Sequence, residues 1–316
     1  MSPDTYPQPN PPPPAGEGEG KRQHTKRAPS PASGGGLGWG LSDVRGVAEI
    51  GFAVKDGATR LAHLYERNPL RVLFPSPVAG DVPVAVLVTT SGGLVAGDRV
   101  AIGVDMGAGA AAHITGSAAE KIYRSTGATI QLGQHLEVRA GGWLEFLPPE
   151  TIVFDRARLQ RRTRIDLHGD AGFLGGGILV FGRIAMGERF SEGLLHEGWE
   201  VYRDGRLIWG DALHIADNVV AIMEDPACFA GTPSCATLIL APRDRDPRPY
   251  VEPARAVQER SATEGLRAGV TAVNGLLVAR WLGDPVTVRR AYAELACHLR
   301  QATMGLPPRL PRLWHV

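Results

Sequence analysis

Short apolar or alternating runs recur along most of the chain, and turn-forming residues separate them. The runs cover residues 84–90, 99–106, 129–138, 143–148, 150–155, 163–168 and 177–183. Runs of this length at regular spacing are typical of β-strands, whereas βαβ units would place long helical patterns between them. The pattern therefore predicts a mostly β fold, a large multi-strand β-scaffold.

The segment WEVYRDGRLIWGD, residues 199–211, predicts a β-hairpin. Asp204 and Gly205 lie between two arms rich in β-forming residues. An Asp-Gly pair readily adopts the positive φ angles that a two-residue type I′ turn requires. The turn is therefore expected at these two residues.

The sequence predicts about two helices, one of them near the C-terminus. Asp284 is a typical N-cap, and Pro285 is a typical first helical residue. An apolar stripe at helical spacing follows, and its members are Val288, Tyr292, Leu295 and Leu299, with Gly305 and Pro307 placed to end the helix. A short helix is also predicted over residues 118–124, because Ser117 and Glu120 match a capping box.

Residues 1–40 differ in composition from the rest of the chain. They are rich in proline, glycine, serine and charge, and they contain almost no large apolar side chain. Such a segment buries too little apolar surface to offset the entropy lost on ordering. We expect a disordered tail over residues 1–40 and one β-scaffold domain over residues 41–316.

Charge and cysteine content narrow the classes of function. With 34 basic and 33 acidic side chains, the net charge of +1 provides no overall field to attract nucleic acid or an anionic membrane. No apolar run reaches the roughly 20 residues of a membrane helix, and no secretory signal is recognisable, so a cytoplasmic location is expected. Cys228, Cys235 and Cys297 fit neither a disulfide framework nor a zinc knuckle, and we expect reduced thiols.

The glycine-rich stretch TTSGGLVAGDRV, residues 89–100, fits no catalytic loop. Gly92 and Gly97 have the spacing of a phosphate-binding loop, but Asp98 stands where that loop needs a lysine, and its charge repels phosphate. A nucleophile elbow needs glycine two residues before Ser91, where the chain has Thr89. The stretch is therefore interpreted as a turn, and no catalytic residue is predicted.

Histidines and carboxylates form no recognisable local motif. The nine histidines stand apart, without H-x-H or H-E-x-x-H spacing. Glu120, Glu150, Asp155 and Glu188 would suit acid–base work if the fold brought them together, but spacing alone does not decide this.

Several long blocks, taken in order, resemble the urease accessory protein family UreD, also called UreH. The blocks are residues 59–75, 89–100, 118–125, 143–167, 177–193, 199–213 and 306–316. The resemblance extends from Phe52 to Trp314, which is nearly the whole domain.

The resemblance implies a mostly β scaffold that is not an enzyme. It implies a chaperone that binds UreF and, with the GTPase UreG, docks on apo-urease and helps to insert nickel. It further implies that nickel passes through an internal tunnel, with no tightly bound cofactor. Such a passage needs weak oxygen ligands rather than a cage of cysteine and histidine.

Candidate site residues follow from the positions that match the family blocks. The predicted nickel path consists of Ser91, Asp98, Glu120, Glu150, Asp155 and Glu188, and the predicted partner contacts are Lys121, Arg124 and Trp314. Each has a structural alternative: Asp98 would cap a turn, Asp155 would end a strand, and Glu188 would be solvated. A partner-binding surface with tryptophan and leucine also predicts poor solubility without UreF.

Four positions depart from the family pattern. Pro149 replaces a usual glutamine, Ala96 replaces a common glycine, and Gly176 and Gly177 stand where many members have a tryptophan and an acid. If that acid lines the tunnel, this chain lacks it, which weakens the transfer of the nickel-transport mechanism to this chain.

Two alternative functions stay open: a pure interaction scaffold without metal transfer, and a carboxylate-based hydrolase.

Overall fold

The computed structural model describes residues 45–315, and it is mostly β, as the sequence predicts. The expected tail over residues 1–40 and the start of the domain at residue 41 lie outside the described residues. The strands of the first half are β1 (Gly46–Lys55), β2 (Ala58–Arg67), β3 (Leu70–Leu73), β4 (Val84–Thr89), β5 (Arg99–Met106), β6 (Ala111–Gly116), β7 (Glu120–Ile122), β8 (Ile130–Val138) and β9 (Trp143–Phe146).

The second half contains the remaining strands and the helices. The strands are β10 (Thr151–Val153), β11 (Arg158–Leu167), β12 (Gly172–Phe181), β13 (Leu194–Arg203), β14 (Arg206–Ala216), β15 (Ser234–Ala241), β16 (Arg267–Val273) and β17 (Leu276–Gly283). The helices are α1 (Val219–Glu224), α2 (Arg248–Arg260) and α3 (Pro285–Met304), with short 3-10 turns η1 (Ile184–Met186) and η2 (Arg312–His315).

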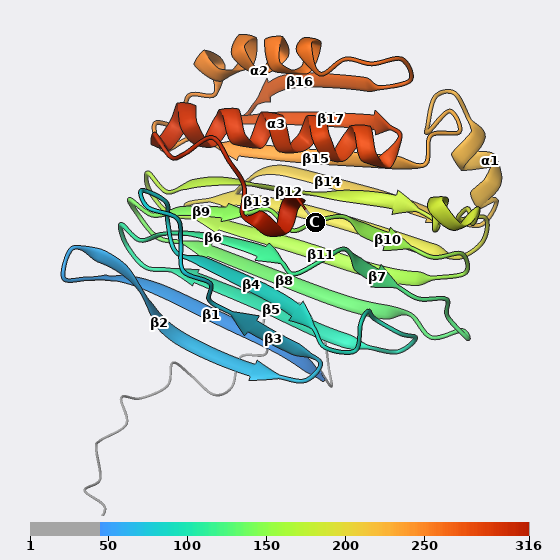
Figure 1. Ribbon diagram of the computed structural model, residues 1–316, viewed down its shortest axis with the longest axis horizontal. Helices are drawn as coiled ribbons and strands as arrows, with labels where there is room; N and C mark the ends of the chain where they lie inside the picture. Colours follow the sequence, from blue (N-terminus) through green and yellow to red (C-terminus); the bar gives the residue numbers. More distant parts are fainter. Residues whose placement is uncertain (1–44, 316) are drawn as a thin grey trace, which may run out of the picture. The chain divides into compact units, whose positions relative to one another are not determined.

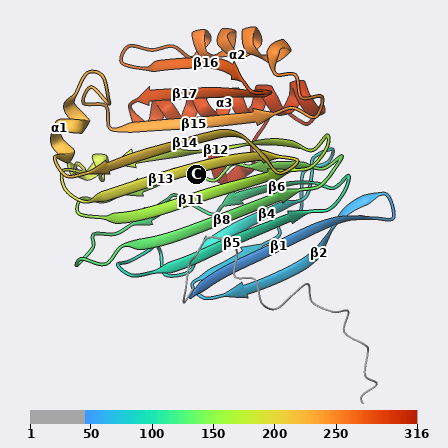
Figure 2. The same cartoon turned by 180° about the vertical axis from the view of Figure 1, so that it is seen from behind.

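Within the described residues the strands form two sheets (Figures 1 and 2). The seven-stranded sheet has the order β14-β13-β11-β8-β5-β1-β2. The ten-stranded sheet has the order β16-β17-β15-β12-β9-β6-β4-β3, and β10 and β7 extend it beside β12. Figure 2 shows the seven-stranded sheet from its outer face.

The chain coils between the two sheets. From β5 it crosses to β6, returns to β8, crosses to β9, and continues in this way through β11, β12 and β13. Consecutive strands of the coil within one sheet are therefore parallel, as β5, β8, β11 and β13 are. Parallel pairing arises here without helical crossovers, because each return passes through a strand of the opposite sheet.

The main hydrophobic core fills the space between the sheets. Alternate residues of β11 point inward, and Leu159, Ile165 and Leu167 are fully buried there. The alternation follows from the two-residue period of a strand. Arg162 is exposed on the opposite face of the same strand.

Helices α2 and α3 cover the outer face of the ten-stranded sheet, α2 over β16 and β17 and α3 over β12, β15 and β17 (Figure 1). The predicted stripe of α3 is buried there, and Tyr292 stacks on Trp314 and makes an edge-to-face contact with Trp281. The side chain of Asp284 accepts hydrogen bonds from the first turn, and Gly305 ends the helix with φ 64°. This helix was predicted correctly at both ends.

A buried arginine anchors α3 to the β-scaffold. Arg300 is 1% exposed, and its Nη2 lies 2.6 Å from Asp81 Oδ1 and 3.0 Å from Glu145 Oε2. Glu145 Oε2 also lies 2.7 Å from His113 Nδ1. Because a buried charge without a partner is strongly destabilising, these pairs fix how the helix sits on the sheet.

The hairpin prediction is confirmed, and the prediction of a helix over residues 118–124 is wrong. Asp204 and Gly205 have φ angles of 51° and 78° between β13 and β14. Residues 120–122 instead form strand β7, which pairs in parallel with β10. The capping-box pattern is local, whereas the pairing with β10 and the full burial of Ile122 are tertiary interactions that outweigh it.

Helix α2 was not predicted from the sequence, since it contains Pro253 and begins after Pro247. Among the helices of residues 45–315, none combines the length and apolarity needed to cross a membrane.

We expect Leu295→Ala to lower the free energy of unfolding by about 2–5 kcal/mol, because it leaves a cavity beneath α3. Val286→Ala, at a position 77% exposed on the same helix, should change it by less than about 0.5 kcal/mol. Urea denaturation followed by circular dichroism measures both. Equal effects of the two substitutions would contradict the packing of α3 on the sheet.

Candidate functional site

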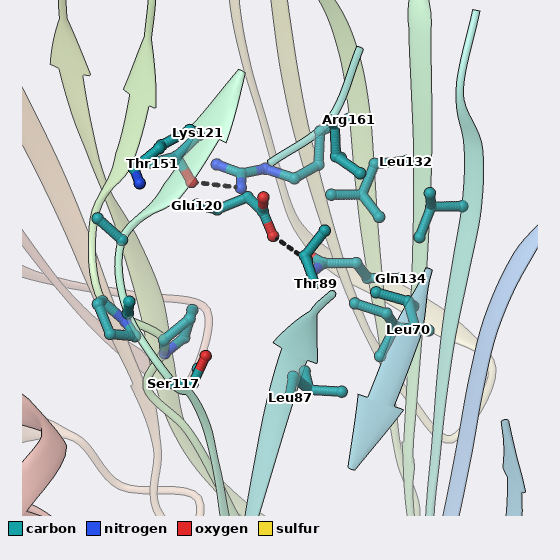
Figure 3. A pocket seen from close by; sticks show the side chains of 18 of the residues that line it. Leu70, Leu87, Thr89, Ser117, Glu120, Lys121, Leu132, Gln134, Thr151 and Arg161 are labelled. Carbon is teal, nitrogen blue, oxygen red and sulfur yellow. Dashed lines mark hydrogen bonds between the residues drawn. The ribbon is translucent and has the colours of Figure 1, made fainter. Parts of the chain in front are cut away.

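A cavity of about 280 Å³ opens between the two sheets, where β4, β5, β7, β8 and β11 meet (Figure 3). Apolar side chains from both sheets form most of its walls, and a smaller number of polar side chains also line it. The polar side chains that line it are Thr89, Ser117, Glu120, Lys121, Gln134, Thr151 and Arg161.

Glu120 is the carboxylate of this cavity. Thr89 Oγ1 donates a hydrogen bond of 2.5 Å to Glu120 Oε2 (Figure 3). Burial raises the pKa of Glu120 above its usual value, while the hydrogen bond from Thr89 and the charge of Arg161 act in the opposite direction. The cavity therefore holds a carboxylate that is more easily protonated than one in water.

Arg161 is the cation of the same cavity, and it is buried. Its Nε donates to Glu197 Oε2 at 2.6 Å, and its Nη1 donates to Thr151 Oγ1 at 2.9 Å. Burial raises the pKa of Glu197, and the charge of Arg161 opposes that shift. The guanidinium is thus held by Glu197 on one side and lies near Glu120 on the other.

A second polar pair completes the inner wall. Thr163 Oγ1 donates to Gln134 Oε1 at 2.7 Å, and both side chains are buried. Gln134 and Thr163 are paired residues of neighbouring strands β8 and β11. Buried polar groups are retained at little cost only when they are hydrogen-bonded, which is the case here.

Two residues of the predicted nickel path, Glu120 and Glu150, lie on neighbouring chain segments, but their side chains point in different directions. The amide of Glu120 donates to the carbonyl of Glu150 at 2.9 Å. The Glu150 carboxylate pairs with Arg289 of α3 at 3.0 Å. Glu120 therefore lines the cavity, and Glu150 connects the β-scaffold to the helix.

Asp155 and Glu188 are brought together away from Glu120. The amide of Asp155 donates to Glu188 Oε1 at 3.1 Å, and Arg183 Nη2 lies 2.5 Å from Glu188 Oε2. Asp155 Oδ1 accepts from the amide of Ser191 at 2.8 Å. Hydrogen bonds lower the pKa of Glu188, chiefly that from Arg183, and those from Ser191 lower the pKa of Asp155 despite some burial.

Ser91 and Asp98 shape the turn that forms one rim of the cavity. Ser91 Oγ donates to the carbonyl of Gly93 at 2.7 Å, and Asp98 Oδ2 accepts from the amide of Val95 at 2.8 Å. Gly92 and Leu94 of this turn line the cavity. Both side chains thus stabilise the turn, which for Asp98 is the structural alternative stated above, and a role of either residue in a nickel path stays a prediction.

The predicted partner contacts differ in exposure. Lys121 and Arg124 are exposed. Trp314 is 5% exposed, and its Nε1 donates to the carbonyl of Leu147 at 3.1 Å. Trp314 thus packs the C-terminal segment onto the scaffold, and its role in partner binding stays a prediction.

Sequence reasoning missed the buried polar residues Arg161, Gln134, Thr163 and Glu197. A signal for Arg161 and Thr163 exists in β11: both alternate with Leu159, Ile165 and Leu167 on the inward face. Two polar residues on an otherwise apolar strand face indicate either a buried network or a cavity. The partner Glu197 lies 36 residues further on, so no local pattern connects it to Arg161.

Two of the four departures from the family pattern, Pro149 and Gly177, fall near this cavity. Pro149 lines it, and Gly177 faces the interior beside Arg161. A Cβ placed on Gly177 would lie 4.0 Å from Arg161 Nη2, so the backbone leaves room for a side chain there. At Gly176 a Cβ would collide with the carbonyl of Thr237, so this backbone accepts only glycine at that position.

The described part of the chain contains no cluster of side chains that would bind a metal ion tightly. Residues 45–315 contain no group of three or more His, Cys, Asp or Glu side chains arranged to hold a metal ion. Cys228, Cys235 and Cys297 are free thiols. Burial raises the pKa of Cys235 to about 12, which keeps that thiol protonated.

The fold and the cavity define a coiled two-sheet β-scaffold with a small polar interior site. Residues 44–315 match the family model described as UreD urease accessory protein. The urease accessory protein UreD of Magnetococcus marinus is 41% identical over 278 residues, which cover 86% of this chain and 94% of that protein. The UreD proteins of Azorhizobium caulinodans and Methylorubrum populi are 38% and 40% identical, over 85% of this chain and over 95% and 87% of their own lengths. The chain belongs to the UreD family of urease accessory proteins.

We expect opposite pH effects from Glu120→Gln and Asp155→Asn. Because the folded pKa of Glu120 is raised, its contribution to stability is full below about pH 4.3 and is lost as pH rises through the folded pKa. Wild type should therefore lose stability relative to Glu120→Gln as pH rises from 4 to 8. The pKa of Asp155 is lowered, so its contribution is present above about pH 3.9 and is lost only in stronger acid.

Urea denaturation at several pH values between 4 and 8 measures both differences. The gap between wild type and Asp155→Asn should stay nearly constant over this range, and wild type should be the more stable protein. A gap between wild type and Glu120→Gln that does not change with pH would show that Glu120 is not buried as described.

Proposed function

We propose that this chain is a non-enzymatic maturation scaffold for urease, which acts in the cytoplasm with UreF and the GTPase UreG to insert nickel into apo-urease. Membership of the UreD family supports the urease accessory role. The observation that carries the finer proposal is the cavity between the sheets, with the Glu120 carboxylate held by Thr89.

The chemistry of this cavity suits an ion in transit. Glu120, Thr89 and Gln134 offer oxygen atoms, which bind a divalent ion more weakly than thiolates or a histidine cage would. Arg161 opposes a second positive charge, although Glu197 partly neutralises it. We propose that nickel passes on the Glu120 side and is not retained, because the neighbouring guanidinium keeps its affinity low.

The hydrolase alternative is weakened by the state of the paired carboxylates. Asp155 and Glu188 are close, but hydrogen bonds lower the pKa of both. General acid catalysis near neutral pH needs a carboxyl group whose pKa is raised toward the working pH. Neither member of this pair meets that requirement, so the pair is better suited to holding its loop.

Partner binding is supported by apolar side chains on the surface. Leu73, Phe74 and Val78 are 57%, 40% and 50% exposed, and they line a groove of about 820 Å³ next to Leu310. Exposed apolar surface of this kind is typical of interaction sites. We expect the chain to precipitate when it is expressed alone and to stay in solution when it is coexpressed with UreF. Equal solubility in both cases would argue against this surface as the UreF contact.

The experiment for the nickel route is coexpression of this chain with UreF, UreG and urease, reading assembly and urease nickel content together. Glu120→Gln should leave the complex assembled but lower the nickel content of urease by about tenfold, as loss of a group at a metal site typically does. Asp56→Asn, in the exposed turn between β1 and β2, is the matched control and should have no effect.

Two outcomes would limit the proposal. If Glu120→Gln and Glu150→Gln both leave assembly and nickel content unchanged, only the scaffold without metal transfer survives. If urease is fully active with normal nickel content when this chain is omitted, the maturation role itself is wrong.

A further inference from the structure

The outer face of the seven-stranded sheet brings together two histidines that are 18 residues apart in the sequence. His196 of β13 and His214 of β14 are directly opposite each other in the hairpin. Their ring centroids are 5.5 Å apart, and the ring planes form an angle of 61°. The strand-by-strand arrangement is visible in Figure 2, where β13 and β14 lie side by side.

A β-bulge creates this pair. Counted from the turn, where Arg203 pairs with Arg206, an uninterrupted register would place His196 opposite Leu213. The register shifts by one residue between Val201 and Tyr202, so His196 meets His214 instead. Bulges commonly re-aim side chains at functional positions.

The two rings are accessible from solvent. His214 is exposed and His196 is half-buried, and both point away from the core between the sheets. A Cβ on the neighbouring Gly198 would lie 3.4 Å from His196 Nε2, which shows that the ring lies beside this glycine. Gly198 pairs with Ala212 of β14 and with Arg162 of β11, so a small residue and the arginine flank the histidine pair on that side.

The ring separation matches a shared metal ion. Imidazole nitrogen binds zinc at about 2.0–2.1 Å, which places the ion about 3.2 Å from the ring centroid. Two rings that share an ion at the tetrahedral angle then have centroids about 5.2 Å apart. The observed separation of 5.5 Å is close to this value, so the spacing of the two rings is compatible with one shared ion.

We propose that His196 and His214 form a surface site for one divalent transition-metal ion of the zinc class. The two imidazoles supply two ligands, and water completes the coordination. This is a site of two protein ligands, in keeping with the lack of larger metal-binding groups among residues 45–315.

The charged groups around the pair determine the affinity expected of the site. Arg162 of β11 lies beside His196 on the same face of the sheet. The other charged group that faces outward nearby on β13 is Glu200, which accepts a hydrogen bond from Tyr202. Arg162 repels a bound cation as well as a proton, so we expect moderate affinity that a third ligand from a partner would increase.

This proposal does not depend on the nickel route described above. The histidine pair lies on the outer face of the seven-stranded sheet, whereas Glu120 lies between the sheets. The two proposals can fail independently. The Glu120→Gln variant tests only the interior nickel route, and the histidine variants test only the surface metal site.

The test is a titration with Zn²⁺, in which the protein competes with a chromogenic chelator for the ion. The full-length protein is used without a histidine tag, and in complex with UreF if it is insoluble alone. The complex is compared with UreF alone. His196→Ala and His214→Ala should each weaken binding by at least about tenfold, as loss of one of two ligands requires. His63→Ala removes an exposed histidine from β2 and serves as the matched control with unchanged binding.

A shared ion makes two further results diagnostic. The double variant should bind no more weakly than either single variant, because the first substitution already removes the site. With Cu²⁺ as probe, electron paramagnetic resonance should show coupling to two imidazole nitrogens in the wild type, and this two-nitrogen signal should be absent from both single variants. Wild-type affinity in both single variants, or additive losses in the double variant, would overturn the proposal.

Discussion

The in-register parallel pairing of β5, β8, β11 and β13 is the constraint on which both faces of the seven-stranded sheet depend. Because strand side chains alternate with a period of two, a slip of one residue would exchange the inward and outward sets. In the observed register Arg161 faces the cavity and Arg162 faces solvent. Gln134 and Thr163 meet for the same reason, since they are partners in the β8–β11 ladder.

The interior of the scaffold contains more charge than a simple hydrophobic core. Arg161 with Glu197, and Arg300 with Glu145 and Asp81, are pairs held by short hydrogen bonds. Removing one member of such a pair leaves an uncompensated buried charge, which costs far more than the pair contributes. These pairs fix positions: one orients a guanidinium at the cavity, and the other sets α3 on the ten-stranded sheet.

Elements defined by local patterns could be predicted from the sequence, and contacts between distant strands could not. The hairpin at Asp204 and the helix from Asp284 depend on turn and cap chemistry within a few residues, and both are present. The segment at Glu120 shows the limit, because a local capping signal there is overridden by pairing with β10. The coiled path of the chain between the two sheets also could not be predicted from the apolar runs. A strand has the same alternating pattern whether its partner strand is parallel or antiparallel.

The candidate site shows the same limit. Glu120 was identified by its family block, but its neighbours Thr89 and Arg161 come from strands 31 and 41 residues away in sequence. His196 and His214 stand alone in the sequence, and only a one-residue bulge makes them neighbours. Nothing in the composition of the hairpin reveals which register it adopts.

The contact between Arg300 and Asp81 joins residues 219 positions apart, and this separation bears on synthesis of the chain. Each strand of the coil pairs with one made shortly before it, so the two sheets can form progressively as residues leave the ribosome. Helix α3 is made near the end, and until then Trp143, Leu174 and Leu238 on the outer face of the ten-stranded sheet have no cover. The nascent protein therefore exposes an apolar sheet face until α3 has been synthesised, and this interval is when it is most vulnerable to aggregation.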